Sequence, residues 1–481
     1  MSWRHLILKI KALSFCASWL LCVLPSFPQV TSADRQFSHQ VLKELIEINT
    51  TDSVGNVTTA SEAMAKRFRD AGFAESDIFI GGPNDRKENL VVRLRSTGAK
   101  KPVLLMGHLD VVEANREDWT TNPFQLVEKD GYFYARGVED MKASDAIFVV
   151  NLIRLKREGY KPDRDIILAL TADEEGGKAN GIDWLLKNHR ELVDAEFALN
   201  ADGGGVTTEK GKPFIVEMGA SEKLYADYEL EVTNPGGHSS IPTPENAISR
   251  LADALVRLQN YKFPFELNDV TRTFFEQTAR VKTGQEAADM LAVTKTPADQ
   301  AAIERLSRDA YYNSTMHTTC VATRLQAGHA NNALPQRATA NVNCRILPGH
   351  SRAEILNELV KVVNDPKVSV TYVNNGMKVI MGDRERIALS PVPLNPDVMD
   401  PLKQISAEMW PGAPVVPTMG TGATDGVYTN PAGIPTYGVC GLAIDIDDDR
   451  SHGRDERLPV DSYYGGVDFY YRYLKAVAGG K

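Results

Sequence analysis

Apolar runs of four to seven residues recur in the first half of the chain, and each leads into acidic or imidazole side chains. The runs cover residues 103–107, 132–135, 165–171 and 197–200. Short apolar runs bounded by polar residues predict buried strands. They lead, in chain order, to His108 and Asp110, to Asp140, to Glu174 and Glu175, and to Asp202. A helix cap or a solvated loop explains each ending separately, but four endings of one kind indicate a shared site at the carboxyl edge of a sheet.

Apolar positions at helical spacing predict helices around these strands. The helices are expected over residues 36–49, 59–71, 144–158 and 462–477. Strands that alternate with helices are typical of the α/β class. We therefore predict an α/β catalytic domain with a mixed, mostly parallel sheet flanked by helices.

The pattern changes near residue 217. Strands expected at 224–232, 338–346 and 368–373 are apolar on one side only, and helices are expected at 244–259 and 353–364. One-sided strands with paired helices indicate a small α+β layer inserted into the larger domain. We divide the chain into a signal peptide (1–33), the first part of the catalytic domain (34–216), an inserted domain (217–366) and the second part of the catalytic domain (367–481).

The first 33 residues have the composition of a secretory signal peptide. Arg4, Lys9 and Lys11 precede an apolar run over 12–27, and small residues follow at 31–33. The run is short for a membrane span, and an uncleaved anchor is the alternative. Its removal takes away three basic and no acidic residues, which changes the net charge from −9 to −12. We expect a secreted or periplasmic protein that leaves the membrane after signal removal and, being acidic, does not bind nucleic acid.

Three cysteines remain in the mature chain, at Cys320, Cys344 and Cys440. Their number and spacing do not fit a cysteine-based metal site. One disulfide with one free thiol is an alternative. We expect three buried, inert thiols.

The residues at the strand ends are suited to zinc, which takes imidazole nitrogen and carboxylate oxygen. The available set is His108, Asp140, Glu175, Asp202 and His452. With Asp140 shared, each of two zinc ions has one histidine and one further carboxylate, and a position stays open for water. Two cations also relieve the repulsion among crowded carboxylates. We therefore predict two Zn²⁺ per subunit, with Co²⁺ or Mn²⁺ as alternatives.

Two acidic residues outside this set are expected to have roles other than metal binding. Glu174 is the spare acid, able to take a proton from the attacking water and pass it to the leaving amine. Asp110 is expected to hold the imidazole of His108 in the required tautomer. The glycine-rich stretch 420–426 lacks a phosphate-binding lysine, so we do not interpret it as a phosphate loop.

Eight short motifs occur together in a fixed order along the mature chain. They are GHLD, ARGVEDMK, ADEEGG, NADGG, PGGHSS, NNALP, GTGATDG and SHGRDE. This ordered set resembles the M20 family of metallopeptidases, which includes carboxypeptidases, aminoacylases and dipeptidases. The resemblance spans His108 to Glu456.

The resemblance implies a role for each candidate residue. His108, Asp140 and Asp202 would hold one zinc ion, and Asp140, Glu175 and His452 the other. Asp110 would support His108, and Glu174 would be the general base. A cis peptide bond is implied after Asp140.

The resemblance also implies that the inserted domain acts as a lid and forms the interface of a homodimer. His238 would reach the active site of the partner subunit and polarise the scissile carbonyl, although from sequence alone a stretch such as GGHSS is more often a turn with an exposed imidazole. Asn332 and Arg345 would hold the free carboxylate of the substrate. A surface position is an equally good explanation for Arg345.

These features predict a zinc-dependent hydrolase that cleaves a peptide or amide bond next to a free carboxylate, as carboxypeptidases and dipeptidases do. Its substrate would be a small peptide or an N-acyl amino acid. The alternatives are an N-acyl amino acid hydrolase, which acts only on acylated substrates, and a catalytically silent binding protein. A dimetal phosphoesterase is disfavoured because no basic phosphate clamp is present.

Overall fold

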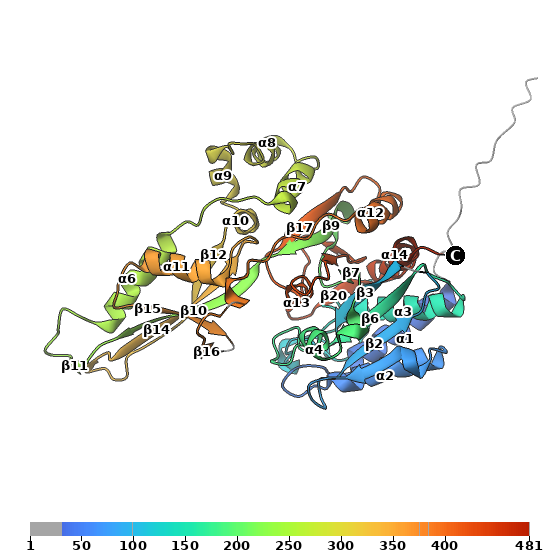
Figure 1. Cartoon of the computed structure of the whole chain (residues 1–481), viewed down its shortest axis with the longest axis horizontal. Coiled ribbons are helices and arrows are strands. Elements are labelled where there is room, and N and C mark those ends of the chain that lie inside the picture. The colour runs from blue at the N-terminus through green and yellow to red at the C-terminus, as the bar shows by residue number, and fades with distance from the viewer. Residues whose placement is uncertain (1–30, 99, 375, 383, 481) are drawn as a thin grey trace, which may run out of the picture.

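The computed structural model describes residues 31–98, 100–374, 376–382 and 384–480. Figure 1 shows a large lobe, which holds the first and last segments of the described chain, and an elongated lobe built from the middle segment. The large lobe matches the predicted α/β domain, and the elongated lobe carries a separate sheet. The expected fold class is therefore confirmed.

The large sheet is mixed, and its centre is parallel. Its strand order is β1 (Ile78–Gly81), β2 (Asn89–Leu94), β6 (Arg164–Thr171), β3 (Lys100–His108), β7 (Phe197–Asn200), β18 (Thr436–Gly438), β9 (Lys212–Glu222), β8 (Gly205–Glu209) and β19 (Ala443–Asp445), with β17 (Val415–Gly420) paired to β9. β6, β3, β7 and β18 run parallel to one another, whereas β1, β2 and the β8–β9 pair add antiparallel neighbours.

Helices cover both faces of this sheet. One face carries α1 (Ser32–Glu47), α2 (Val57–Asp70), α3 (Lys142–Arg157), α12 (Pro396–Met409) and α14 (Val460–Ala478), and the other carries α4 (Gly181–Asn188), α5 (Arg190–Val193) and the loop after α13 (Gly426–Thr429). Along β3, Val103 and Leu105 pack on the first face, while Leu104 and Met106 pack on the second. Because both faces are buried, the strand is apolar throughout rather than alternating.

The run at 132–135 does not join this sheet. It forms β5 (Tyr132–Tyr134) in a small sheet between β20 (Arg457–Pro459) and β4 (Val127–Lys129). Asp140 therefore arrives on the turn between β5 and α3, and not at the end of a strand of the large sheet. Short 3-10 turns lie at η1 (Glu75–Asp77), η2 (Arg116–Asp118) and η3 (Arg384–Arg386).

The elongated lobe contains a five-stranded antiparallel sheet. Its order is β12 (Thr319–Ala327), β14 (Arg337–Ile346), β10 (Leu224–Thr233), β15 (Ser369–Asn374) and β16 (Met377–Lys378). The helices α6 (Ala247–Asn260) and α11 (Arg352–Val363) pack with it in one core. The expected boundary at residue 366 is too early, because β15 pairs with β10 and extends this sheet.

The helical stretch in the middle of the expected insert packs elsewhere. It forms α7 (Asp269–Thr278), α8 (Gly284–Val293), α9 (Gln300–Leu306) and α10 (Ala310–Met316). Its apolar residues share a core with Ile215 of β9 and Val416 of β17. Figure 1 accordingly places α7 beside β17. The stretch therefore covers an edge of the large sheet.

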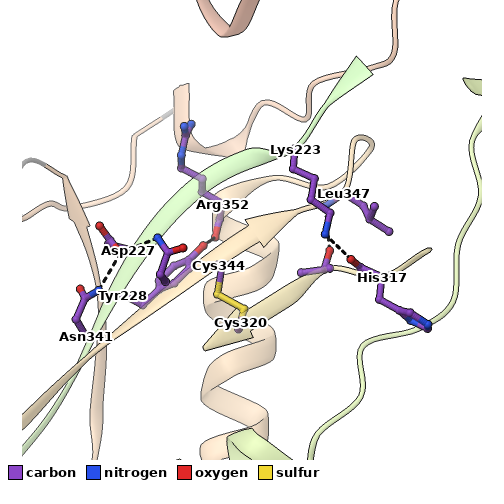
Figure 2. Close-up of a disulfide and its surroundings, with 11 residues drawn as sticks. Lys223, Asp227, Tyr228, His317, Cys320, Asn341, Cys344, Leu347 and Arg352 are labelled. Atoms are coloured by element: carbon purple, nitrogen blue, oxygen red, sulfur yellow. Dashed lines mark hydrogen bonds between the residues drawn. A yellow bond between two sulfur atoms is a disulfide. The ribbon is translucent and has the colours of Figure 1, made fainter. Parts of the chain in front are cut away.

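The cysteine prediction was wrong for Cys320 and Cys344 and right for Cys440, so the alternative of one disulfide with one free thiol holds. Cys320 of β12 and Cys344 of β14 are register partners and form a disulfide, as Figure 2 shows. Cys440 is a free, buried thiol. Whether two cysteines face each other depends on the register of paired strands, which the spacing of the cysteines does not contain.

The predicted signal peptide lies almost wholly outside the described residues. The structure begins at Thr31, which caps α1 and exchanges hydrogen bonds with Asp34 in a capping box. Cleavage after Ala33 would remove this cap. No helix within the described ranges is both long enough and apolar enough to cross a membrane.

Candidate metal centre

One edge of the large domain collects the predicted ligands. His108 ends β3, Glu174 and Glu175 follow β6, and Asp202 follows β7. β3, β6 and β7 are parallel neighbours, so their carboxyl ends meet at the same edge. Asp140 precedes α3, and His452 precedes β20.

Asp140 lies between the two histidines. Its Oδ1 is 3.1 Å from Nε2 of His108, and its Oδ2 is 3.0 Å from Nε2 of His452. On the far sides, His108 Nε2 is 3.9 Å from Asp202 Oδ1, and His452 Nε2 is 3.0 Å from both oxygens of Glu175. The five residues thus form a continuous row in which Asp140 presents one oxygen to each half.

The spacing of these atoms fits a pair of metal ions. Two ligand atoms about 2.1 Å from one tetrahedral zinc ion lie roughly 3.4 Å apart. The separations within the row are 3.0 to 3.9 Å. Nitrogen and carboxylate oxygen are also the donor types that zinc takes. The residues present therefore fit a dinuclear centre.

Electrostatics point the same way. Burial raises the pKa of Asp202 to about 6, against the opposing effect of His108. Burial and the neighbouring Asp202 also raise the pKa of Glu174. Hydrogen bonds to Asp140 and Glu175 raise the pKa of His452 to about 10. Four carboxylates are thus crowded around two imidazoles, a distribution of charge that divalent cations would relieve.

Asp110 contacts the centre in a different way from the one expected. Nδ1 of His108 is 3.0 Å from the backbone oxygen of Asp110 and 3.9 Å from its carboxylate. The carboxylate instead accepts the backbone N–H groups of Glu174 at 3.2 Å and Glu175 at 3.0 Å. The backbone of Asp110 therefore orients the imidazole, while its side chain holds the loop that carries both glutamates.

Comparison with known proteins decides the family. The model of peptidase family M20/M25/M40 matches residues 104–476, which is most of the chain. The chain belongs to this family. The family resemblance found in the ordered motifs is thereby confirmed.

Two curated relatives illustrate the range within the M20 family. Over 389 residues the chain is 31% identical to a probable carboxypeptidase S-like 2 of Dictyostelium discoideum, and the alignment covers 78% of this chain and 71% of the relative. Over 384 residues it is 28% identical to the N-fatty-acyl-amino acid synthase/hydrolase PM20D1 of Xenopus tropicalis, at 78% and 72% coverage. The M20 chain is an enzyme that acts on peptide or amide bonds.

Solved structures share the M20 fold over nearly the whole chain. An M20 metallo-carboxypeptidase from Sulfolobus solfataricus aligns with a TM-score of 0.68 at 16% identity, covering 92% of this chain and 99% of the other. A dinuclear metal binding M20 peptidase from Bacillus subtilis aligns with a TM-score of 0.57 at 11% identity, covering 94% and 100%. At these identities the likeness concerns the fold.

The peptide bond between Asp140 and Met141 is cis, as the M20 resemblance implied.

Two residues that support the M20 centre were missed by the sequence reasoning. The buried carboxylate of Glu456 accepts hydrogen bonds from Arg136 at 2.5 Å and from the backbone N–H groups of Gly137, Glu139 and Asp140. Arg136 also donates to the backbone oxygen of His452 at 3.2 Å. This pair ties together the two loops that carry Asp140 and His452. Both residues stand inside the motifs ARGVEDMK and SHGRDE, so the motifs contained the signal.

The three candidates in the insert lie in two places. Arg345 lines a cavity of about 1020 Å³ that Asp140, Glu174, Glu175, Asp202 and His452 also line. Its guanidinium lies 4.8 Å from the ring centre of Tyr225. The side chains of His238 and Asn332 are exposed on the pair formed by β11 (Gly237–His238) and β13 (Ala333–Leu334) and its flanks. Figure 1 places β11 at the end of the insert that is remote from the large domain, so the structure does not bring these two residues to their own centre.

Proposed function

We propose that the protein is a dizinc hydrolase that cleaves a peptide bond next to a free carboxylate, as a carboxypeptidase or dipeptidase does. The observation that carries the proposal is the position of Asp140, whose two oxygens each face a different histidine. A carboxylate placed in this way is suited to bridge two cations. Co²⁺ or Mn²⁺ would suit the same donors.

We assign His108, Asp140 and Asp202 to one zinc ion, and Asp140, Glu175 and His452 to the other. When bound, such a pair supplies Lewis acidity, which makes water acidic enough to be a nucleophile near neutral pH. Arg136 and Glu456 keep the bridging residue in place from behind.

Glu174 is the proposed general base. Its carboxylate lies within 4.8 Å of ligand atoms of His108 and Asp202. Glu175, by contrast, contacts His452 directly. Glu174 can therefore accept a proton from the attacking water and deliver it to the nitrogen of the leaving amine.

Arg345 is the proposed partner of the substrate carboxylate. Its guanidinium faces the cavity and stacks on Tyr225. A guanidinium forms bidentate pairs with carboxylates, and this would place the scissile bond toward the acidic side of the cavity.

His238 and Asn332 are proposed to act in the other subunit of a homodimer. Both lie on the remote end of the insert, so in one chain they cannot assist the centre. A dimer formed through the insert would carry His238 of the partner subunit to the scissile carbonyl and Asn332 of the partner subunit to the substrate. The segment 1–33 supports secretion or export to a periplasm.

A second candidate function is hydrolysis of N-acyl amino acids. It is favoured by the likeness to the Xenopus tropicalis relative, whose name gives N-fatty-acyl-amino acids. A panel of free dipeptides and N-acyl amino acids with the same C-terminal residues separates the two functions. Cleavage of dipeptides supports the first proposal, and cleavage of acylated substrates alone supports the second.

The mechanism is tested with Glu174→Gln. Since general base catalysis contributes about 10²- to 10⁴-fold, we expect kcat to fall by that factor while bound zinc, measured by elemental analysis, stays at the wild-type amount. A variant as active as the wild type would refute the assigned base. Wild-type protein that binds no metal would refute the dizinc centre.

A further inference from the structure

The chain passes from the large domain to the insert through a single residue. Glu222 ends β9 in the large sheet, and Leu224 begins β10 in the sheet of the insert, with Lys223 between them. Lys223 is buried, and its Nζ donates to the backbone oxygen of His317 at 2.7 Å, as Figure 2 shows, and to Oγ of Ser314 at 3.1 Å. The crossing is therefore held in place by the segment in which α10 ends and the chain leads into β12.

Glu222 faces the other way, toward the glycine-rich loop 420–426. Its Oε2 accepts the backbone N–H of Thr424 at 2.8 Å and the hydroxyl of Thr424 at 3.1 Å. Thr424 lines the same cavity as the proposed metal ligands. The loop is thus tied to the residue at which the two domains meet.

The hydroxyl of Thr424 continues the connection to the metal centre. It accepts a hydrogen bond from Nδ2 of Asn200 at 3.2 Å, and Oδ1 of Asn200 accepts the backbone N–H of Asp202 at 3.1 Å. The donors and acceptors follow one direction: Asp202 donates to Asn200, Asn200 to Thr424, and Thr424 to Glu222. An asparagine amide and a hydroxyl can each donate and accept at once, so these three hydrogen bonds can form at the same time.

We propose that Glu222, Thr424 and Asn200 are positioning residues that hold Asp202 in place for its zinc ion. The proposal rests on the function proposed above, in which Asp202 is a ligand. Hydrogen bonds behind a ligand fix its orientation, and their loss typically lowers metal affinity about 10- to 100-fold. Since Glu222 lies where the polypeptide passes into the insert, this series of hydrogen bonds also links the position of the insert to the metal centre.

The test compares substitutions within one loop. Thr424→Val removes the hydroxyl and keeps the shape of the side chain, whereas Thr424→Ser keeps the hydroxyl. Thr421→Val is the control, because it makes the same change three residues earlier, at a residue that is not part of this series of hydrogen bonds. Zinc affinity is measured by competition with a chelator. We expect Thr424→Val to weaken one of two zinc sites about 10-fold, and Thr424→Ser and Thr421→Val to bind zinc as the wild type does.

A double-mutant cycle places Glu222 on the same path. Glu222→Leu removes Oε2, which accepts both hydrogen bonds from Thr424. We expect it to weaken the same zinc site, with no further loss when it is combined with Thr424→Val. Glu222→Gln keeps one acceptor and should lose less affinity than Glu222→Leu. The thermal midpoint of each metal-free variant is recorded to identify any that fails to fold.

The outcomes separate this proposal from the proposed function. If the wild type binds two zinc ions and Thr424→Val binds them equally tightly, the positioning role is wrong while the dizinc function stands. If the effects of Glu222→Leu and Thr424→Val multiply, Glu222 does not act through Thr424. If the wild type binds no zinc, the proposed function itself fails.

Discussion

Arg136 and Glu456 form a buried ion pair next to the centre. The side chain of Arg136 is 3% exposed, and that of Glu456 is fully buried. A buried ion pair offsets its desolvation only when its remaining hydrogen bonds are also made. The three backbone N–H groups that Glu456 accepts meet this condition for the carboxylate, whereas the buried Nε of Arg136 makes no hydrogen bond. The pair therefore fixes the turn that carries Asp140 instead of merely adding stability.

Glu456→Gln should destabilise the protein strongly. The change leaves the guanidinium of Arg136 buried without a carboxylate, which costs about 3 kcal/mol of the free energy of unfolding. Urea denaturation measures the loss. Glu75→Gln, which breaks an exposed pair with Arg69, is the matched control and should have a far smaller effect. Equal losses in the two variants would contradict the structural role of Glu456.

Lys223 gives the stability a dependence on pH. Burial and the nearby Arg345 lower its pKa to about 7. The unfolded chain keeps this lysine protonated to about pH 10, so between pH 7 and 10 the unfolded state binds more protons. The contribution of Lys223 to stability therefore rises with pH across this window.

Lys223→Met should remove that rise. The free energy of unfolding of the wild type, minus that of the variant, is expected to increase from pH 7 to pH 10 in urea titrations. The exposed Lys403 supplies the control, since Lys403→Met should give a difference that does not change over the same window. A difference for Lys223→Met that does not change with pH would mean that burial does not lower the pKa of Lys223.

Among the elements, β12 depends most on a covalent tie. It is an edge strand, and its side chains from Val321 to Ala327 are all exposed. Few apolar contacts therefore hold it to the sheet. The disulfide between Cys320 and Cys344 joins it to β14, which also presents Arg345 to the cavity.

Removal of this disulfide should loosen the insert. For a closed loop of this size we expect the Cys320→Ala, Cys344→Ala double variant to lose about 3 kcal/mol of stability, measured by chemical denaturation. A reducing agent should destabilise the wild type and leave the double variant unaffected. A wild type that is insensitive to reductant would show that the bond is absent or without effect.

At the scale of the whole molecule, the proposed dimer makes a quantitative prediction. His238→Ala subunits keep their own Glu174, and Glu174→Gln subunits keep their own His238. A mixed dimer therefore contains one complete site, formed from Glu174 of the first subunit and His238 of the second. Half of randomly formed dimers are mixed, so about a quarter of wild-type activity should return on mixing.

The measurement uses the two inactive variants, unfolded and refolded together and then assayed. Each variant refolded alone is the control and should stay inactive. Activity in the mixture that does not exceed the sum of the two controls would show that the site is not shared between subunits.

The sequence alone determined which strands are buried and which side chains stand at their ends. The uninterrupted apolar runs before His108, Glu174 and Asp202 follow from burial on both faces of the sheet, and an apolar run is visible without coordinates. The family could also be recognised from the sequence alone, because the order of the motifs is a property of the linear chain.

Only the tertiary structure decided what depends on register and on long-range contact. It paired Cys320 with Cys344, placed β15 in the insert and packed α7 to α10 against the large sheet. It also joined Arg136 to Glu456, which are 320 positions apart in the chain. Local patterns record which face of a strand or helix is apolar, whereas strand register and the partners of buried charges are set by the packing of distant segments.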